Sequence, residues 1–144
     1  MKFITLGNLR IFSFTTTASI FILMLLGSYT SSIGAGLACP DWPLCPNITS
    51  YPIFIEFLHR TWSMVTLLFI LITLFIALKL KGNGYEGIKK STYALITVFL
   101  AQVFWGALNI FLTLNPIIVT VHQGLATLTF GLALILTLQA YQRR

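Results

Sequence analysis

The chain has 144 residues, of which 57% are hydrophobic and only 8% are charged, and its mean hydropathy is +0.90. This composition excludes an ordinary soluble domain and is typical of an integral membrane protein. The net charge of +6 then reflects membrane topology and contact with anionic lipid, and it does not indicate a nucleic-acid partner.

Four apolar stretches are each long enough for a transmembrane helix, which needs about 20 apolar residues. They cover about residues 11–30, 54–78, 92–114 and 117–139. Asn115 and Pro116 separate the last two and are a turn signal between antiparallel helices. Residues 1–144 are therefore expected to form one all-α domain, an antiparallel bundle of four transmembrane helices.

The first stretch also has features of a secretory signal peptide, since basic residues precede it and small residues come before Cys39. Its apolar region is longer than a signal peptide needs. Gly36 also stands where a lipoprotein signal has an aliphatic residue, three positions before the cysteine. We therefore expect this stretch to remain as the first helix of the bundle.

Membrane proteins concentrate Lys and Arg in their short cytoplasmic loops. In this chain the loop of about residues 31–53 contains no basic residue. We therefore expect a multi-pass protein of the cell membrane with this loop outside and both termini in the cytoplasm. Basic residues occur before the first stretch, between the second and third, and after the fourth: Lys2, Arg10, Lys79, Lys81, Lys89, Lys90, Arg143 and Arg144.

The only two histidines, His59 and His122, lie inside the second and fourth stretches. At about 1.5 Å per residue they fall about 9 Å and about 7 to 8 Å below the outer surface, so their depths agree within one helical turn. Two imidazoles at one depth on different helices are suitable axial ligands for a haem iron. The alternative is that each imidazole bonds a backbone carbonyl or a nearby hydroxyl.

Two charged residues accompany His59. Glu56 lies one turn nearer the outside on the same helical face. It is expected either to cap the first turn of its helix or to act as a proton acceptor beside the haem. Arg60 points about 100° away from His59, towards a haem propionate, a lipid headgroup or Glu56.

The third and fourth stretches contain further candidates for the pocket lining. Asn109 and Trp105 are expected near the histidine layer, and Gln102 deeper. As members of a packed bundle these residues are expected to be structural rather than catalytic. Small residues that leave room for a flat macrocycle, and that serve ordinary helix packing equally well, are Gly106, Ala107, Gly124 and Gly131.

The outer loop contains the only two cysteines, Cys39 and Cys45. Both are expected on the oxidising side of the membrane, so a disulfide between them is expected. It is either a structural staple or a redox-active bond, and the sequence leaves both open. Two cysteines without a nearby histidine fall short of a zinc site. Asn47-Ile48-Thr49 matches a glycosylation sequon, whose use depends on the host.

Taken in order, these segments resemble the haem A synthase family. The resemblance runs from about Gly27 to Ala126, and the cysteine loop is its most specific part. It rests on Gly36-Leu37-Ala38-Cys39-Pro40-Asp41-Trp42-Pro43-Leu44-Cys45, Glu56-Phe57-Leu58-His59-Arg60, Gln102 with Gly106-Ala107, Asn115-Pro116 and His122.

The resemblance implies an enzyme that oxidises a methyl substituent of haem O to a formyl group, giving haem A for terminal oxidases. Water supplies the oxygen, and electrons pass to an acceptor. By resemblance, His59 and His122 match a haem ligand pair and Glu56 the carboxylate beside the reacting haem. Cys39 and Cys45 match a cysteine pair that has been given a role in haem handling or electron transfer.

Family members usually have two similar four-helix halves, one holding substrate haem and the other a haem b cofactor. This chain supplies one half, so the resemblance implies a homo-oligomer or a single site that serves both purposes. Expected partners are haem O, haem A, membrane lipid, a haem O synthase and an electron acceptor. Ser31 stands near a place where the family tends to have a basic residue, which leaves Arg60 as the candidate for a propionate contact.

Two other functions stay open. A quinone-linked thiol oxidoreductase also presents outer cysteines, although such proteins usually use a tighter Cys-x-x-Cys pair. A cytochrome b-like electron carrier or a haem-delivery subunit needs only two histidines. Nothing in the residue spacing identifies a methyl group as the target, and that step rests on the resemblance alone.

Overall fold

The computed structural model describes residues 3–45, 47–82 and 84–143, and all their regular secondary structure is helical. Each helix is long and apolar enough to cross a membrane, which confirms the predicted four-helix transmembrane protein. Of the residues discussed above, Lys2 and Arg144 lie outside the described residues. The helices are α1 (Leu6–Ser32), α2 (Tyr51–Lys79), α3 (Glu86–Phe111) and α4 (Pro116–Gln142).

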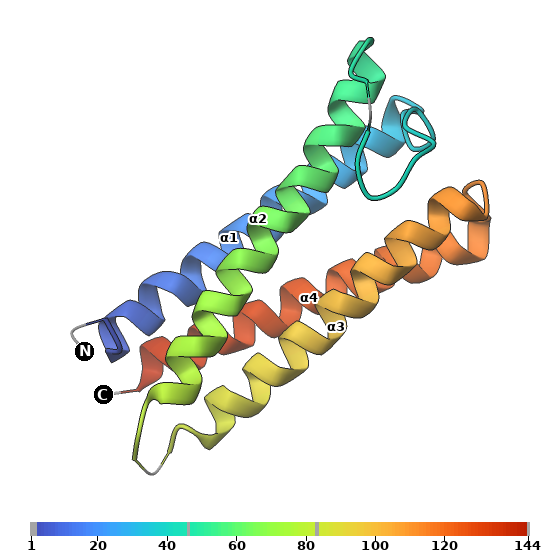
Figure 1. Ribbon diagram of the computed structural model, residues 1–144. Coiled ribbons are helices and arrows are strands. Elements are labelled where there is room, and N and C mark those ends of the chain that lie inside the picture. The colour runs from blue at the N-terminus through green and yellow to red at the C-terminus, as the bar shows by residue number, and fades with distance from the viewer. Residues whose placement is uncertain (1–2, 46, 83, 144) are drawn as a thin grey trace.

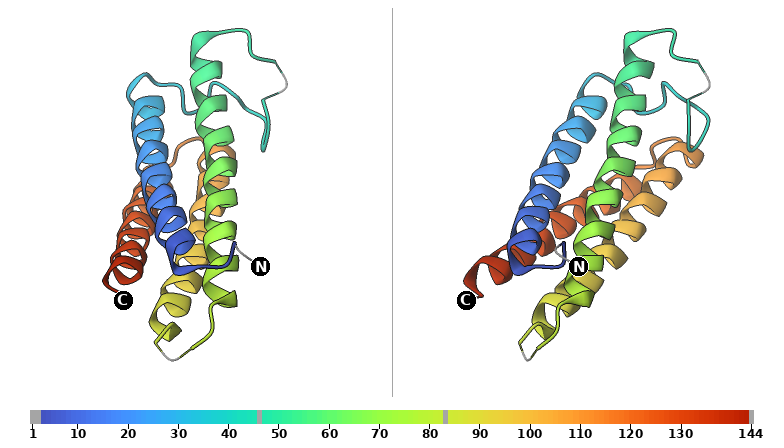
Figure 2. Two further views of the ribbon diagram at one scale, coloured as in Figure 1. Left: turned by 90° about the vertical axis from the view of Figure 1, so that its left-hand side faces the viewer. Right: turned by 60° about the vertical axis from the view of Figure 1, so that its left-hand side comes forward.

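The helices form two antiparallel hairpins, α1 with α2 and α3 with α4 (Figure 1). The hairpins meet through α1 with α4 and through α2 with α3, so the described parts of α2 and α4 lie diagonally opposite and their backbones do not approach each other. The beginning of α1, the end of α4 and the α2–α3 loop share one end of the bundle (Figure 2). The α1–α2 loop and the α3–α4 turn share the other end. Which end faces the cytoplasm remains a prediction from the basic residues.

The helices extend beyond the predicted membrane spans at most ends, but α3 stops three residues early, at Phe111. Thr113 and Leu114 have φ of 48° and 57°, a left-handed conformation that a helix does not continue through. The predicted turn is confirmed, because α4 begins at Pro116 and the Asn115 side chain caps it by accepting the N–H of Ile117 at 3.0 Å.

The packed core lies at the end of the bundle that contains the two termini. Hydroxyl pairs join helices beside it: Thr16 with Thr73 and Thr17 with Thr137, each at 2.9 Å, and Ser19 with Thr66 at 2.8 Å. In a membrane, where water is absent, such interhelical bonds satisfy the hydroxyl groups and hold the helices together. At the other end of the bundle the two hairpins diverge (Figure 1). The fully buried apolar side chains include Leu9, Ile70, Ile76, Leu95, Phe99 and Leu136.

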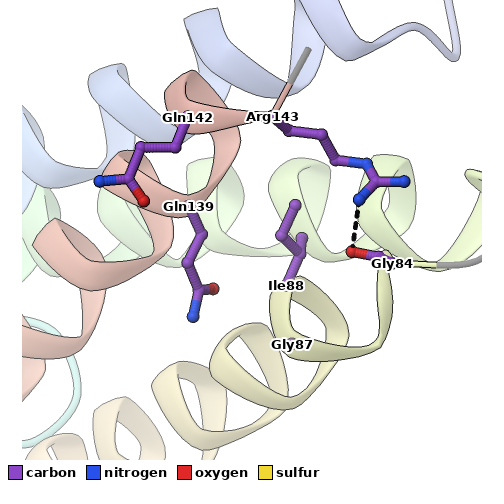
Figure 3. Close-up of a pocket in the computed structure, with 6 residues that line it drawn as sticks. All are labelled: Gly84, Gly87, Ile88, Gln139, Gln142 and Arg143. Carbon is purple, nitrogen blue, oxygen red and sulfur yellow. Dashed lines mark hydrogen bonds between the residues drawn. The ribbon is translucent and has the colours of Figure 1, made fainter.

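A small cavity of about 270 Å³ lies between the start of α3 and the end of α4 (Figure 3). At its wall Arg143 donates from Nη1 to the carbonyl of Gly84 at 2.8 Å, and its guanidinium lies 4.1 Å from the centre of the Tyr85 ring. None of its lining residues is a histidine, cysteine or carboxylate, so we assign it no ligand-binding role. They are Gly84, Gly87, Ile88, Gln139, Gln142 and Arg143.

Candidate functional site

A cavity of about 860 Å³ lies between the two hairpins at the end with the long loop. This volume is within the usual range for small-molecule and cofactor sites. His59 enters it from α2 and His122 from α4, the diagonally opposite helices. The structure therefore brings the only two histidines of the chain to one cavity, as their matched depths predict.

The ring of His122 is fixed by α3. Its Nδ1 lies 3.1 Å from the carbonyl oxygen of Gln102, and its Nε2 lies 3.3 Å from the Gln102 side-chain nitrogen. A carbonyl oxygen only accepts, so Nδ1 carries the proton and Nε2 keeps its lone pair. Histidines that bind metals are commonly oriented in this way, with the other ring nitrogen donating to a backbone carbonyl.

The ring of His59 is held less completely. Its Nδ1 is buried and has no hydrogen-bond partner among the residues that the structure describes. The backbone of Leu23, on α1, faces the ring. A buried ring nitrogen without a partner costs free energy. The alternative that each imidazole only bonds a backbone carbonyl agrees with the Gln102 contact of His122, and for His59 it stays a prediction.

Glu56 lines the same cavity and is only 4% exposed. Its Oε2 accepts the backbone N–H of Cys39 at 2.8 Å, and its Oε1 forms an ion pair with Arg60. Because α2 begins at Tyr51, Glu56 lies beyond the first helical turn. The interpretation of Glu56 as a cap of that turn is therefore wrong.

Arg60 binds the outer loop as well as Glu56. Its guanidinium donates to the carbonyl oxygens of Cys39, at 2.7 Å, and Asp41, and Nη1 lies 3.4 Å from the Cys39 sulfur. Of the three partners considered from sequence, Glu56 is the one that the structure shows. We call the set of Glu56, Arg60, Cys39 and Asp41 the loop clamp.

The outer loop is closed by a disulfide between Cys39 and Cys45. Both half-cystines are buried, at 2% and 9% exposed. Trp42 and Pro43, between them, line the cavity. A Cβ atom built on Gly36 falls 3.3 Å from the Leu114 side chain in the α3–α4 turn, so the loop reaches across from one hairpin to the other.

The remaining sequence candidates divide into two groups. Gln102, Asn109, Gly106 and Ser31 line the cavity, and Oε1 of Gln102 and Oδ1 of Asn109 are buried without a partner in the described part of the chain. The others do not line it: Trp105, Ala107, Gly124 and Gly131.

Sequence reasoning missed Gly27, a cavity-lining residue of α1 that packs directly under the His59 ring. The signal available was a single glycine inside an apolar helical stretch, which marks a close approach by another group. The sequence gives no indication of which group that is.

The fold and the site define a multi-pass membrane protein whose helical bundle encloses a cavity with one histidine from each hairpin. The family model described as cytochrome oxidase assembly protein matches residues 46–135, more than half of the chain. The chain belongs to this family.

Curated relatives named heme A synthase match along nearly the whole chain. That of Bacillus pumilus (strain SAFR-032) is 27% identical over 140 residues, which is 93% of this chain and 45% of the relative. That of Exiguobacterium sibiricum is 29% identical over 143 residues, covering 94% and 48% respectively. That of Bacillus cereus (strain AH187) is 30% identical over 129 residues, covering 85% and 41%. The chain thus spans about half the length of these relatives, and no solved structure matches it.

Proposed function

We propose that the chain provides a haem site of a haem A synthase-type oxidoreductase, with His59 and His122 as the axial ligands of the iron. The observation that carries the proposal is the convergence of both histidines, from diagonal helices, on one cavity that also contains a buried carboxylate. The family membership and the names of the relatives support the same chemistry.

The residues fit a haem with two imidazole ligands. The Nδ1 of His122 is held by the Gln102 carbonyl, and its unprotonated Nε2 accepts from the Gln102 side-chain amide, which has to turn away when Nε2 binds iron. The lone buried Nδ1 of His59 leaves that ring free to adopt the same arrangement. Haem O bound here supplies the methyl substituent that is oxidised to the formyl group of haem A. Extraction of the bound pigment shows whether the site holds haem O, haem b or both.

Glu56 is the candidate proton acceptor. A carboxylate offers about four lone-pair positions, and the N–H of Cys39 and the guanidinium of Arg60 occupy one on each oxygen. These two bonds orient the carboxylate at the cavity wall, and the remaining lone pairs accept a proton from water or substrate. Arg60 thus serves as a positioning residue for Glu56, and because it also lines the cavity it stays the candidate for a propionate contact.

The remaining parts of the proposal concern the whole assembly. The cysteine loop lies on the extracytoplasmic side and covers the mouth of the cavity. The protein works as a homo-oligomer, in which each copy contributes one four-helix unit. A haem O synthase delivers the substrate, and an electron acceptor takes the electrons.

The test is to purify the full chain from cells that also produce haem O, and to extract its pigment. We expect haem A, or a hydroxylated haem O, and a low-spin spectrum that His59→Ala and His122→Ala each abolish. Glu56→Gln is expected to keep bound haem but to form no product. Glu86→Gln, which changes an exposed carboxylate at the start of α3, is the matched control and is expected to behave as the parent chain.

Other outcomes point to the other functions. Haem b alone, with no conversion of haem O, indicates an electron carrier or haem-delivery subunit that uses the same histidine pair. A protein without haem whose disulfide exchanges with thiols indicates a thiol oxidoreductase. Full haem A production by Glu56→Gln removes the proposed role of that carboxylate.

A further inference from the structure

In each hairpin the histidine ring packs against a glycine of the preceding helix. A Cβ atom built on Gly27 of α1 falls 3.0 Å from Cε1 of His59, 3.5 Å from Nδ1 and 3.8 Å from Nε2. A Cβ atom built on Gly106 of α3 falls 3.0 Å from Cε1 of His122, 3.6 Å from Nδ1 and 3.8 Å from Nε2. In each hairpin the imidazole therefore rests on a glycine of the preceding helix, in nearly the same orientation.

The match extends one turn further along each helix. Gln102, whose carbonyl oxygen accepts from His122 Nδ1, lies four residues before Gly106. Leu23, whose backbone faces the His59 ring, lies four residues before Gly27. The same pair of features, a glycine and a backbone group one turn earlier, thus occurs on both sides of the cavity.

We propose that Gly27 and Gly106 are positioning residues that set the position and tilt of the two imidazoles, so that both rings can bind one iron between the hairpins. The proposal rests on the haem site put forward above and names a further requirement of that site. It also implies that on haem binding the His59 Nδ1–H donates to the Leu23 carbonyl, as that of His122 does to Gln102.

The contact distances explain why glycine is needed. Carbon atoms in favourable contact are about 3.5 to 4.0 Å apart, so a methyl group at either glycine pushes the ring away by roughly 0.5 Å. A functional constellation tolerates about that displacement at most. A free histidine side chain yields to such a push, but a ring bonded to iron and to a carbonyl does not yield without weakening one of those bonds.

The glycines of α4 provide matched controls. A Cβ atom built on Gly124 or Gly131 meets nothing within 4 Å, and neither residue lines the cavity. All four positions are helical, so replacing any of them by alanine brings the same gain in helix propensity, about 1 kcal/mol. Only the contact with an imidazole distinguishes Gly27 and Gly106 from Gly124 and Gly131.

The experiment uses the full chain, purified without pigment in detergent and titrated with haem b, for the parent and for Gly27→Ala, Gly106→Ala, Gly124→Ala and Gly131→Ala. Changes in groups that orient metal-bound histidines typically weaken metal binding 10- to 100-fold. We expect a loss of that order in haem affinity for Gly27→Ala and Gly106→Ala, with an admixture of high-spin haem in the optical and electron paramagnetic resonance spectra. The control variants are expected to match the parent in both measurements.

The possible failures can be told apart. If the parent chain binds no low-spin haem, the proposed function fails before any glycine variant is considered. If the parent binds low-spin haem and both cavity variants bind it with unchanged affinity and spectra, the glycine proposal alone is overturned. Circular dichroism of the pigment-free proteins checks the fold. Loss of helical structure in both cavity variants but not in the controls also overturns the proposal, because the glycines are then required for helix packing.

Discussion

Removal of Arg60 is expected to release the outer loop from α2. The Arg60 and Glu56 side chains are only 10% and 5% exposed, so this ion pair is largely shielded from water. In an Arg60→Gln variant the Glu56 carboxylate keeps the N–H of Cys39 but loses its positive partner, and the carbonyls of Cys39 and Asp41 lose their donor.

The size of the effect follows from the burial of the pair. Removing one partner of a buried ion pair typically costs about 3 to 5 kcal/mol, whereas an exposed pair is worth about 0 to 1 kcal/mol. At about 1.4 kcal/mol per tenfold change, the population with an open loop is expected to rise roughly 100-fold or more. The two carbonyl bonds belong to the same clamp, so their contributions are not added separately.

The disulfide provides the assay. Cys39 and Cys45 are both buried, so a reductant reaches their bond through local opening of the loop. The quantity to measure is the rate at which a phosphine reduces the disulfide of the protein in detergent. The thiols that are released react with a maleimide, and mass spectrometry detects the added mass. Arg60→Gln is expected to accelerate reduction roughly 100-fold, up to the rate of an unprotected disulfide.

Two further variants make the reasoning refutable. Lys89→Gln removes the exposed ion pair with Glu86 and is expected to leave the reduction rate unchanged. Combining Glu56→Gln with Arg60→Gln removes both charges and is expected to cost less than Arg60→Gln alone, because no buried charge is left unpaired. Equal reduction rates in the parent and in Arg60→Gln would show that the clamp does not hold the loop.

Two other predictions concern the stability of the bundle. Thr113→Gly is expected to stabilise the protein by about 1 kcal/mol against thermal unfolding, because Thr113 is β-branched and has φ of 48°; a lower unfolding temperature would contradict this. Thr17→Val is expected to cost about 0.6 to 1.7 kcal/mol, since it removes the interhelical bond to Thr137. Thr15→Val, which removes only a bond to the carbonyl of Ile11 within α1, is the control and is expected to cost less.

Most of the fold follows from the sequence because a membrane imposes few solutions. Apolar stretches of sufficient length become helices, and the turn at Asn115 and Pro116 is fixed by a side-chain cap and the constrained φ of proline. The early end of α3 was not predicted. It depends on left-handed φ values at Thr113 and Leu114, which neither residue type favours.

The candidate site is predictable only in part, because depth is readable from sequence but rotation about a helix axis is not. Equal depths bring His59 and His122 to one cavity. On α3, the stripe through Gln102, Gly106 and Asn109 faces the cavity, and Trp105 stands beside that stripe. Gly27 and the loop clamp depend on how α1 and the outer loop pack against α2, which no local pattern encodes.

Each hairpin packs a glycine against its imidazole, but the two hairpins differ in charge. The α1–α2 hairpin places Glu56 and Arg60 at the cavity, whereas the α3–α4 hairpin contributes the neutral amides of Gln102 and Asn109. Charge in a cavity sheltered from water acts more strongly than on a surface, so the two sides of the cavity are chemically distinct although each has one imidazole packed on a glycine. Under the proposed function, the reacting substituent of haem O is therefore expected on the α2 side, where the only carboxylate among the described lining residues accepts the proton.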